Sequence, residues 1–416
     1  MELLYNLSIS LYVIAIRLAA LAGNKKASLW ISGRRNWQQQ VRTALEKAGS
    51  RKRFLFHCAS LGEFEQGRSL IERVRKEFPD AFIVLSFFSP SGYEHRKNYD
   101  GADFVTYLPA DTKSNASVFL DIIRPEKIFF IKYEFWLNFI NVSFKKKIPM
   151  YVVSAIFREK QIFFRSYGRY FLNQLKKIDC IFLQDENSSS LLKKAGIENT
   201  MVTGDTRFDR VIEICRAFQT IPVIEEFSKG HKVIAAGSSW PEDEDLLLDS
   251  MPELKSKARI IFIPHEPDNT HIKRLTDSIR KRHPEKHYVL FSEYKKEETP
   301  DILIVDRIGM LSRIYHYCTI AYIGGGFGKG IHNTLEAAAH GKPVLFGPVY
   351  DKFREAVQLI ETGGAFSIRT ASEASTLFNE LMNNEQKYSE SSKRALQYTI
   401  DNAGATERIY RHVFSR

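Results

Sequence analysis

The chain is predicted to be an α/β protein with two Rossmann-like domains, and three observations support this fold class. Short apolar runs alternate with helix-forming runs along most of the sequence, which is typical of a parallel sheet covered by helices. The 416 residues are enough for two domains of ordinary size. A glycine-rich loop between an apolar run and a helix-forming run, within residues 320–348, has the form of a βαβ unit with a ligand-binding turn.

Composition limits the kinds of partner that the protein can have. Hydrophobic residues make up 44% and charged residues 26%, which excludes a disordered chain. The net charge of +11 favours an anionic partner, such as an acidic membrane surface or a phosphorylated substrate. No nucleic-acid-binding module is recognisable, so nucleic acid is not expected. The four cysteines form no CxxC pair, which argues against zinc and disulfide frameworks and favours a reducing compartment.

The first 22 residues are apolar and close to the length that spans a bilayer. A signal peptide is the first alternative, but the amino end carries Glu2 and no positive side chain, and Arg17 interrupts the apolar run. Four basic residues follow: Lys25, Lys26, Arg34 and Arg35. They would hold the next domain on the cytoplasmic side. We therefore predict that residues 1–45 associate with a membrane, with an ordinary core helix as the remaining alternative.

The first Rossmann-like domain is predicted over residues 46–212. Its expected strands are residues 53–58, 81–87, 127–132, 151–155, 181–183 and 200–203. Active sites of parallel sheets gather at the carboxyl ends of strands, and Ser60 and Glu63 follow the first strand. The same two residues have the spacing of a capping box, so a helix cap is the structural alternative. Ser89 to Gly92, after the second strand, form a turn by composition.

A basic, aromatic segment covers residues 157–177. One interpretation is a solvated basic helix with a packed aromatic stripe. The other is a surface for acyl chains and anionic headgroups. Both interpretations remain open at this point.

The second domain is predicted over residues 213–416. Its expected strands are residues 232–236, 260–263, 302–305, 320–323 and 343–346, and its expected helices include residues 335–339, 373–381 and 385–401. Asp243 and Asp245 imitate the DxD metal motif of some glycosyltransferases. However, Pro241 followed by acidic residues is typical of a first helical turn, so no metal site is predicted.

The glycine loop of the second domain suits a phosphorylated ligand. Glycines let a backbone approach a phosphate, and a helix amino terminus presents free N–H groups to it. Asn333 and Glu336 are three residues apart and share one face of the following helical turn. A carboxylate at this position suits the hydroxyls of a ribose. The alternatives are a turn without a ligand and a glutamate that favours a helix amino terminus.

The run from Gly324 to Pro348, with its Gly-x-His-Asn-x-Leu-Glu-Ala-Ala-Ala core, resembles the donor site of bacterial 3-deoxy-D-manno-octulosonic acid (Kdo) transferases. These are CMP-Kdo-dependent glycosyltransferases of lipopolysaccharide synthesis. The resemblance extends along nearly the whole chain and implies the glycosyltransferase B fold, in which two Rossmann-like domains face a cleft. It also implies CMP-Kdo as donor, a lipid A precursor as acceptor, no cofactor, and a place on the cytoplasmic face of the inner membrane. Because the donor carries one phosphate, no diphosphate is present for a metal to bridge.

The same resemblance implies catalytic and acceptor residues in the first domain. Residues 57–63 resemble the family's H-S-x-S-x-G-E motif, whose glutamate is the proposed catalytic base, here Glu63. Glu134 matches the second glutamate of E-x-E-x-W-P-N, where this chain departs by having Lys132 and Leu137. Arg207 replaces the lysine of T-G-x-x-K-F-D. The acceptor side would contain Ser60, Gly62, Ser89, Ser91 and Arg158.

In the second domain the resemblance implies a CMP-Kdo site. His265 stands where the P-R-H-P motif has arginine, and Met310 stands where M-G-E-L has glutamate. The implied donor residues are Pro264, His265, Ile308, Gly309, Met310, Gly325, Gly326, Asn333, Thr334, Leu335 and Glu336. Two other functions remain possible by sequence: a transferase of the same architecture that uses a UDP-sugar, and an inactive membrane-bound sensor of nucleotide sugars.

Overall fold

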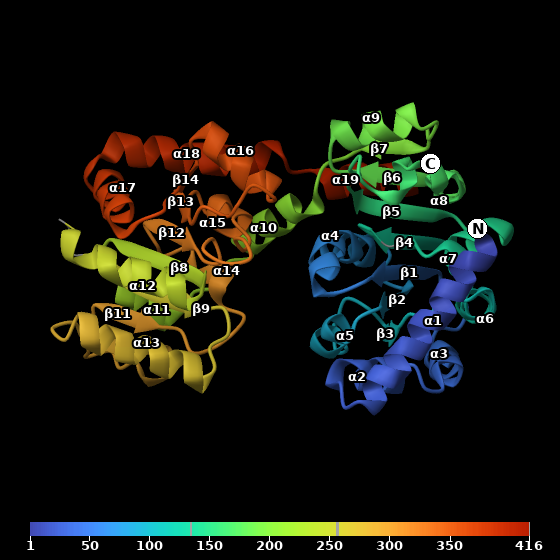
Figure 1. Cartoon of the computed structure of the whole chain (residues 1–416), viewed down its shortest axis with the longest axis horizontal. Coiled ribbons are helices and arrows are strands. Elements are labelled where there is room, and N and C mark those ends of the chain that lie inside the picture. Colours follow the sequence, from blue (N-terminus) through green and yellow to red (C-terminus); the bar gives the residue numbers. More distant parts are fainter. Residues whose placement is uncertain (134, 255–257, 416) are drawn as a thin grey trace. The chain divides into compact units, whose positions relative to one another are not determined.

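The computed structural model describes residues 1–133, 135–254 and 258–415, which form two compact units. Unit 1 consists of Met1–Arg210 and the segment from Ala403, and unit 2 of Val211–Asn402 (Figure 1). The predicted boundary lies two residues away, but the end of the chain is not part of the second domain. Helix α19, Ala405–Phe414, buries Ile409 and Val413 in a core of unit 1, because its apolar face completes the cover of that sheet.

Unit 1 contains a sheet in which the described strands are all parallel. The strands are β1 Arg53–Cys58, β2 Phe82–Phe87, β3 Phe104–Tyr107, β4 Lys127–Ile131, β5 Met150–Ala155, β6 Cys180–Leu183 and β7 Thr200–Val202. Their order is β3-β2-β1-β4-β5-β6-β7. All six predicted strands are confirmed within one or two residues, whereas β3 was not predicted. Its outer two residues are only half-buried, so the apolar run that marks a buried strand is short there.

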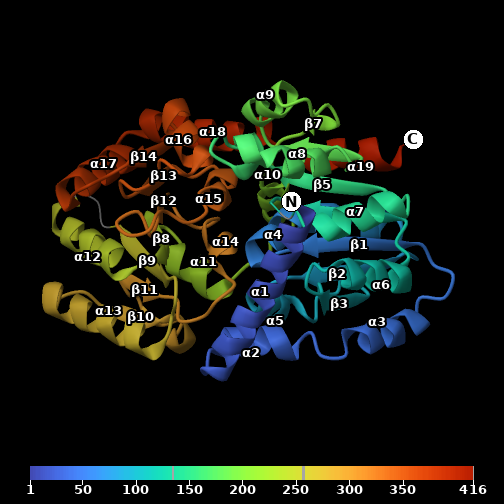
Figure 2. The ribbon, with the colours of Figure 1, turned by 45° about the vertical axis from the view of Figure 1, so that its right-hand side comes forward.

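Side chains of unit 1 alternate between two cores, one on each face of the sheet. Leu55 packs on one face with α3, α6 and α7, whereas Phe54 and Phe56 pack on the other with α4 and α19. The helices of unit 1 are α1 Glu2–Leu21, α2 Lys25–Ser32, α3 Trp37–Glu46, α4 Leu61–Glu77, α5 Pro90–Arg96, α6 Lys113–Ile123, α7 Leu137–Lys145, α8 Arg169–Leu175, α9 Glu186–Lys194 and α19, with α10 Thr206–Arg216 at the boundary. Figure 2 shows α3 and α6 on the same side of this sheet.

Helix α1 is the one described helix long and apolar enough to cross a membrane. It lies on the surface of unit 1, and Ile9 is its buried residue. Eight of its apolar side chains are exposed: Leu3, Leu4, Leu7, Leu11, Tyr12, Ile14, Leu18 and Leu21. The core-helix alternative is therefore wrong, because a core helix would bury these side chains.

Polar contacts hold α1 against α7. Tyr5 donates a hydrogen bond to the carboxylate of Asp111, and Asn138 donates to Asn6 at 2.9 Å. Asp111 also accepts from the backbone N–H groups of Asn138 and Phe139, both at 3.1 Å, in the first turn of α7. Burial raises the pKa of Asp111 to about 6, although these donors oppose the shift. The amino end of α1 is thus built into unit 1.

Arg34 has a structural role that its sequence context did not predict. Arg34 is half-buried; its guanidinium donates to the carbonyls of Leu108 and Phe88 at 2.8 Å each, and lies 3.9 Å from the centre of the Trp30 ring. Burial lowers its pKa to about 9. Arg34 therefore joins α2 to unit 1 through carbonyl and cation–π contacts and is not available for a membrane surface.

Unit 2 repeats the parallel arrangement. Its strands are β8 Val233–Ser239, β9 Arg259–Pro264, β10 Tyr288–Leu290, β11 Ile302–Ile304, β12 Ile320–Ile323, β13 Val344–Phe346 and β14 Ala365–Ser367, in the order β10-β11-β9-β8-β12-β13-β14. Its helices are α11 Pro222–Ser228, α12 Pro241–Ser250, α13 Asn269–Arg282, α14 Leu311–Ile314, α15 Leu335–Ala339, α16 Arg354–Thr362, α17 Ala371–Asn383 and α18 Glu385–Asp401. The predicted strands and helices are confirmed, and the three-residue strands β10 and β14 were not predicted.

Candidate functional site

Unit 1 places its predicted residues at the point where the strand order reverses. β1 and β4 are neighbours, and the chain leaves them toward opposite edges of the sheet. Such a switch point is where ligands bind in open α/β sheets. Glu63 follows β1, Tyr133 follows β4, and Ser89 follows the adjacent β2. The first and last of these loops are joined, because the N–H of Ser89 donates to the carbonyl of Ala59 at 2.8 Å.

The capping box predicted from the spacing of Ser60 and Glu63 does not form. Ser60 stands at the N-cap position of α4, but its side chain accepts no backbone hydrogen bond from the described first turn. The hydroxyl of Ser60 instead donates to Oε2 of Glu63. The half-buried Glu63 carboxylate is therefore not held by a capping box at the start of α4. Its catalytic interpretation remains a prediction.

Tyr133 brings the predicted charged residues of unit 1 into one neighbourhood. Burial raises the pKa of Tyr133, the charges of Arg158 and Arg207 lower it, and the charges of Glu63 and Asp205 raise it. These four charges therefore lie within electrostatic range of one phenol. Arg207 also donates through Nε to Oδ2 of Asp205 at 2.8 Å. Its charge is thus partly neutralised by Asp205. The predicted catalytic Glu134 lies outside the described residues.

The predicted acceptor-side residues Ser89 and Ser91 lie at the amino end of the short helix α5. The hydroxyl of Ser89 accepts from the N–H of Gly92 at 3.4 Å and so caps α5, and it lies 2.9 Å from the hydroxyl of Ser91. A Cβ on Gly92 would lie 2.4 Å from the Phe87 ring, which explains the glycine. Gly62 is exposed in the first turn of α4.

The basic, aromatic segment is not one helix. It consists of two single 3₁₀ turns, Ile162–Phe164 and Ser166–Gly168, followed by α8. A Cβ on Gly168 would lie 1.8 Å from the carbonyl oxygen of Ile162, so the chain folds back tightly here. The solvated-helix interpretation is therefore wrong for residues 157–168.

Unit 2 places its predicted residues at its own switch point, between β8 and β12. Trp240 follows β8, Gly324 follows β12, and His265 follows the adjacent β9. A Cβ on Gly324 would lie 2.2 Å from the carbonyl oxygen of Ser238, which itself has a positive φ of 51°. Strained backbone of this kind gathers at functional sites.

The glycine loop does not offer all its N–H groups to a ligand. The N–H of Gly325 donates to Oδ2 of Asp243 at 2.8 Å. The N–H groups of Gly328 and Gly330 donate to the carbonyl of Gly325 at 3.1 and 3.2 Å. Gly325 has φ +91°, and a Cβ on Gly326 would lie 2.5 Å from the nitrogen of Gly347. The loop thus satisfies these three N–H groups internally. The predicted free N–H groups are those of the following helix amino terminus, which these contacts do not test.

The acidic run of α12 has structural partners. Asp243 accepts from Trp240 N at 2.9 Å and from the hydroxyl of Tyr322 at 2.7 Å, in addition to Gly325. Burial raises its pKa. Among the described residues, no group of three or more His, Cys, Asp or Glu side chains could hold a metal ion. The first-turn interpretation of this run is confirmed.

Three aromatic side chains stack beside the glycine loop. Ring centroids of Trp240 and His265 are 5.0 Å apart, and those of His265 and His332 are 4.3 Å apart. Trp240 donates through Nε1 to Nε2 of His332 at 3.0 Å. Trp240 and His332, with the exposed Lys329, line a cavity of about 390 Å³ that we call the donor cavity. Trp240 and Lys329 were not predicted, although Trp240 follows a strand and Lys329 lies in the glycine loop.

His332 makes the stability of unit 2 dependent on pH. Burial, followed by the charge of His265, lowers the pKa of His332 to about 4. An unfolded histidine titrates near 6.5, so its stabilising contribution is complete above that pH and is lost as the pH falls toward about 4. We expect His332→Gln, which keeps an acceptor for Trp240, to reduce the fall in melting temperature between pH 7 and pH 5. Equal falls in both proteins would contradict this assignment.

Asn333 and Glu336 do not share a helical turn as predicted, because α15 begins at Leu335, but their side chains meet. Nδ2 of Asn333 donates to Oε1 of Glu336 at 3.0 Å, and Oδ1 of Asn333 accepts from Leu335 N. The buried Thr334 hydroxyl has no hydrogen-bond partner among the described residues. Leu335 is fully buried, so its side chain belongs to the core.

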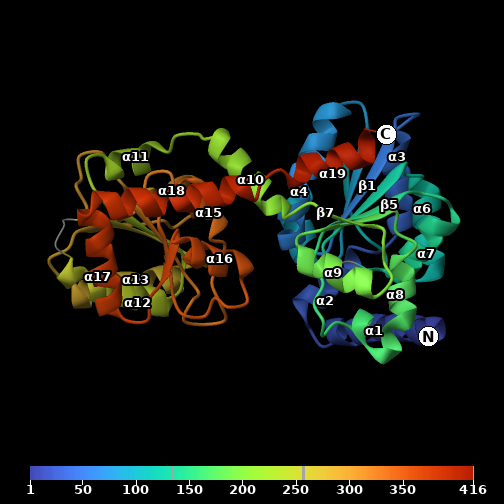
Figure 3. The same cartoon turned by 90° about the horizontal axis from the view of Figure 1, so that it is seen from above.

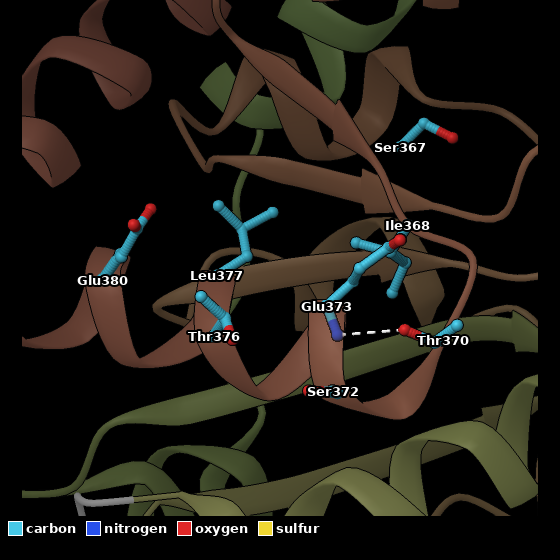
Figure 4. A pocket seen from close by; sticks show the side chains of 8 residues that line it. All are labelled: Ser367, Ile368, Thr370, Ser372, Glu373, Thr376, Leu377 and Glu380. Carbon is cyan, nitrogen blue, oxygen red and sulfur yellow. Dashed lines mark hydrogen bonds between the residues drawn. The ribbon is translucent and has the colours of Figure 1, made fainter.

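The other predicted donor residues are spread over two further loops. Pro264 is buried at the end of β9. Ile308 and Gly309 are exposed before α14, and Met310 stands at its N-cap position. A separate hollow of about 390 Å³ along α17 contains no predicted residue (Figure 4). The dashed line in Figure 4 marks the hydrogen bond from the N–H of Glu373 to the hydroxyl of Thr370, which is an ordinary helix cap.

Comparisons with known proteins agree on one family. Residues 35–210 match the sequence model described as 3-deoxy-D-manno-octulosonic-acid transferase (kdotransferase). The 3-deoxy-D-manno-octulosonic acid transferase of Rickettsia bellii is 27% identical over 87% of this chain and 88% of its own length. That of Aquifex aeolicus is 27% identical over 78% and 85%, and that of Haemophilus influenzae 23% identical over 85% and 84%.

Solved structures agree on the fold. A UDP-GlcNAc 2-epimerase from Neisseria meningitidis, bound to UDP-GlcNAc, superposes with a TM-score of 0.63 at 16% identity, covering 88% of this chain and all of that one. Anabaena Alr3699/HepE in complex with UDP gives 0.57 at 13% identity, with the same coverage. At these identities the likeness concerns the fold alone, which is two parallel-sheet α/β domains of the glycosyltransferase B type.

Proposed function

The chain belongs to the 3-deoxy-D-manno-octulosonic acid transferase family and is thus a glycosyltransferase that moves Kdo in lipopolysaccharide synthesis; from this premise we propose its substrates and its base. The donor is CMP-Kdo, the acceptor is a lipid A precursor of the lipid IVA type, and no divalent metal takes part. The observation that carries the base assignment is that the Glu63 carboxylate follows β1 at a switch point and accepts a hydrogen bond from the Ser60 hydroxyl.

In the proposed reaction Glu63 accepts the proton of an acceptor hydroxyl. The acceptor oxygen forms a bond to the anomeric carbon of Kdo, and the bond from that carbon to the phosphate oxygen breaks, with CMP taking the electron pair. The hydroxyl of Ser60 holds the Glu63 carboxylate in place through its hydrogen bond. Arg158 and Arg207 act electrostatically on the same phenol, that of Tyr133, as Glu63 does.

Unit 2 is the proposed donor site. Lys329, which lines the donor cavity, would supply a positive charge for the phosphate or the Kdo carboxylate in place of the arginine that His265 replaces. His332 cannot do this at neutral pH, because burial lowers its pKa to about 4. The unpartnered hydroxyl of Thr334 would form a hydrogen bond with the ligand, and the Glu336 carboxylate, which also accepts from Asn333, would contact the ribose.

We expect Glu336→Gln to weaken the binding of CMP by about tenfold or more. Hydrogen bonds to a charged group contribute about 1.5 to 3 kcal/mol, and the amide loses the charge that strengthens a ribose contact. Isothermal titration calorimetry measures the change, with Glu361→Gln, an exposed glutamate of α16, as matched control. Unchanged affinity would mean that Glu336 only favours the start of α15.

The proposed reaction is tested by incubating the full chain with CMP-Kdo and a tetraacylated lipid A precursor and reading the products by mass spectrometry. Addition of Kdo, unchanged in excess EDTA, is the expected result. Activity that EDTA abolishes and only a metal restores would overturn metal independence. Preferred binding of UDP over CMP would favour the UDP-sugar alternative, and binding without turnover would favour the sensor.

The proposal includes attachment to the cytoplasmic face of the inner membrane. It is supported by the exposed apolar side chains of α1 and by the net charge of +11. The polar contacts of Tyr5 and Asn6 with unit 1 favour a helix that lies on the membrane over one that leaves the domain to span it.

A further inference from the structure

Unit 1 has a cavity that none of the predicted catalytic residues explains. It measures about 450 Å³, and we call it the aromatic cavity. It is lined by Tyr133, Phe135, Leu137, Arg158, Gln161, Ile162, Phe163 and Phe171. Six of these eight side chains are apolar or aromatic, so a water-soluble sugar would leave most of the wall without a matching surface.

The wall of the aromatic cavity is built from rings that pack on one another. Ring centroids of Phe135 and Phe163 are 5.2 Å apart at an interplanar angle of 76°, and each ring lies 5.5 Å from that of Phe157. Phe157 and Phe163 are buried, whereas Ile162 is exposed at 39%. Edge-to-face packing of this kind stabilises a preformed wall, and Ile162 lies where a ligand can reach it.

Among the described residues that line the aromatic cavity, Arg158 carries the one charged side chain. Arg158 is exposed and has no ion-pair partner among the described residues. Its backbone N–H donates to Oε1 of Gln161 at 3.0 Å, which fixes the turn that carries it. A guanidinium of this kind suits a phosphate, which it can bind through two parallel hydrogen bonds.

The aromatic cavity connects two features of the proposed function. On one side Tyr133 lines it, and the charge of Glu63 acts on that phenol. On the other side the backbone N–H of Leu137 donates to the hydroxyl of Tyr5 in α1 at 3.3 Å. Figures 1 and 3 show the start of α1 beside α7 and α8. The aromatic cavity therefore has the packed amino end of α1 on one side and the neighbourhood of Glu63 on the other.

We propose that the aromatic cavity binds an acyl chain of the phosphorylated lipid acceptor, with Arg158 paired to a phosphate of the same molecule. This inference rests on the proposed function, since it concerns the acceptor of that reaction. An amphipathic lipid satisfies both the aromatic wall and the unpaired cation. A free phosphate would leave the wall exposed, and an uncharged lipid would leave the cation unpaired.

The test measures acceptor binding in mixed micelles without any donor, so it does not depend on turnover. A radiolabelled tetraacylated precursor is the probe. We expect Arg158→Gln to weaken its binding by about tenfold, the effect of losing a hydrogen bond between charged groups. The loss should shrink for the same lipid without phosphate. Arg165→Gln, an exposed arginine of the same segment that does not line the cavity, is the control and should bind normally.

A second variant tests the apolar wall. Ile162→Trp should weaken binding of the acylated probe and leave binding of the deacylated phosphorylated sugar unchanged, because the added ring occupies space for a chain. Tyr167→Ser, at an exposed residue of the same segment outside the cavity, is the matched control. Equal losses for Arg158→Gln and Arg165→Gln, or competition by bulk anionic phospholipid as strong as by unlabelled precursor, would overturn the inference in favour of general membrane attraction. Normal probe binding with no Kdo transfer would overturn the proposed function and leave the cavity assignment standing.

Discussion

Glu63→Gln is expected to lower turnover with CMP-Kdo and lipid acceptor by at least about 100-fold. General-base catalysis contributes about 10² to 10⁴-fold, and glutamine keeps the size of the side chain but cannot take a proton. The affinity for CMP should stay nearly unchanged, because the proposed donor residues belong to unit 2. Steady-state kinetics and calorimetry measure the two quantities separately.

The helix-cap alternative predicts a different result for the same variant. Glutamine serves a capping box as well as glutamate, so stability and turnover would both stay normal. The Ser60 side chain caps no backbone group of the described first turn, which favours the loss of turnover. Glu77→Gln, near the other end of α4, is the control and should be almost fully active. Near-normal turnover in Glu63→Gln would remove the catalytic assignment.

Replacing Leu7, Leu11 and Leu18 together by glutamine should release the protein from membranes. The three leucines are exposed and, at about 100° per residue, lie within about 40° of one another around α1. Each buried leucine contributes about 1.5 kcal/mol or more, and 1.4 kcal/mol is a factor of ten, so the partition coefficient should fall by about 10³-fold. Flotation with vesicles containing anionic lipid measures it.

Substitution is a sharper test than deletion of α1. Removing the helix would also remove Tyr5, Asn6 and Ile9, and would uncover Asp111 and the start of α7. The triple variant should keep its melting temperature and its activity on detergent-dispersed acceptor, and Ser10→Gln should bind vesicles normally. If the triple variant still floats with the vesicles, the anchor lies elsewhere, for example in residues 157–177.

Much of the fold could be predicted because parallel strands buried on both faces are recognisable locally. The strands around Phe54 to Phe56 and Ile320 to Ile323 are continuous apolar runs, and their boundaries agree with the structure. The strands β3, β10 and β14 escaped prediction because part of each is only half-buried, so no continuous buried run marks them in the sequence. The place of α19 in unit 1 was missed because the sequence of a helix indicates which of its faces is apolar. It does not indicate which sheet that face covers.

The sequence by itself determined the class of fold, the residue types that follow each strand and the family they resemble. Only the tertiary structure decided what those residues are free to do. Asp243 lies 82 positions before Gly325 and takes its N–H, Tyr5 lies 106 positions before Asp111, and Arg34 meets the carbonyl of Leu108. A donor that is hydrogen-bonded to a residue far away in the sequence is not available to a ligand. The free groups of a site therefore follow from packing between distant segments, which local patterns of a chain do not encode.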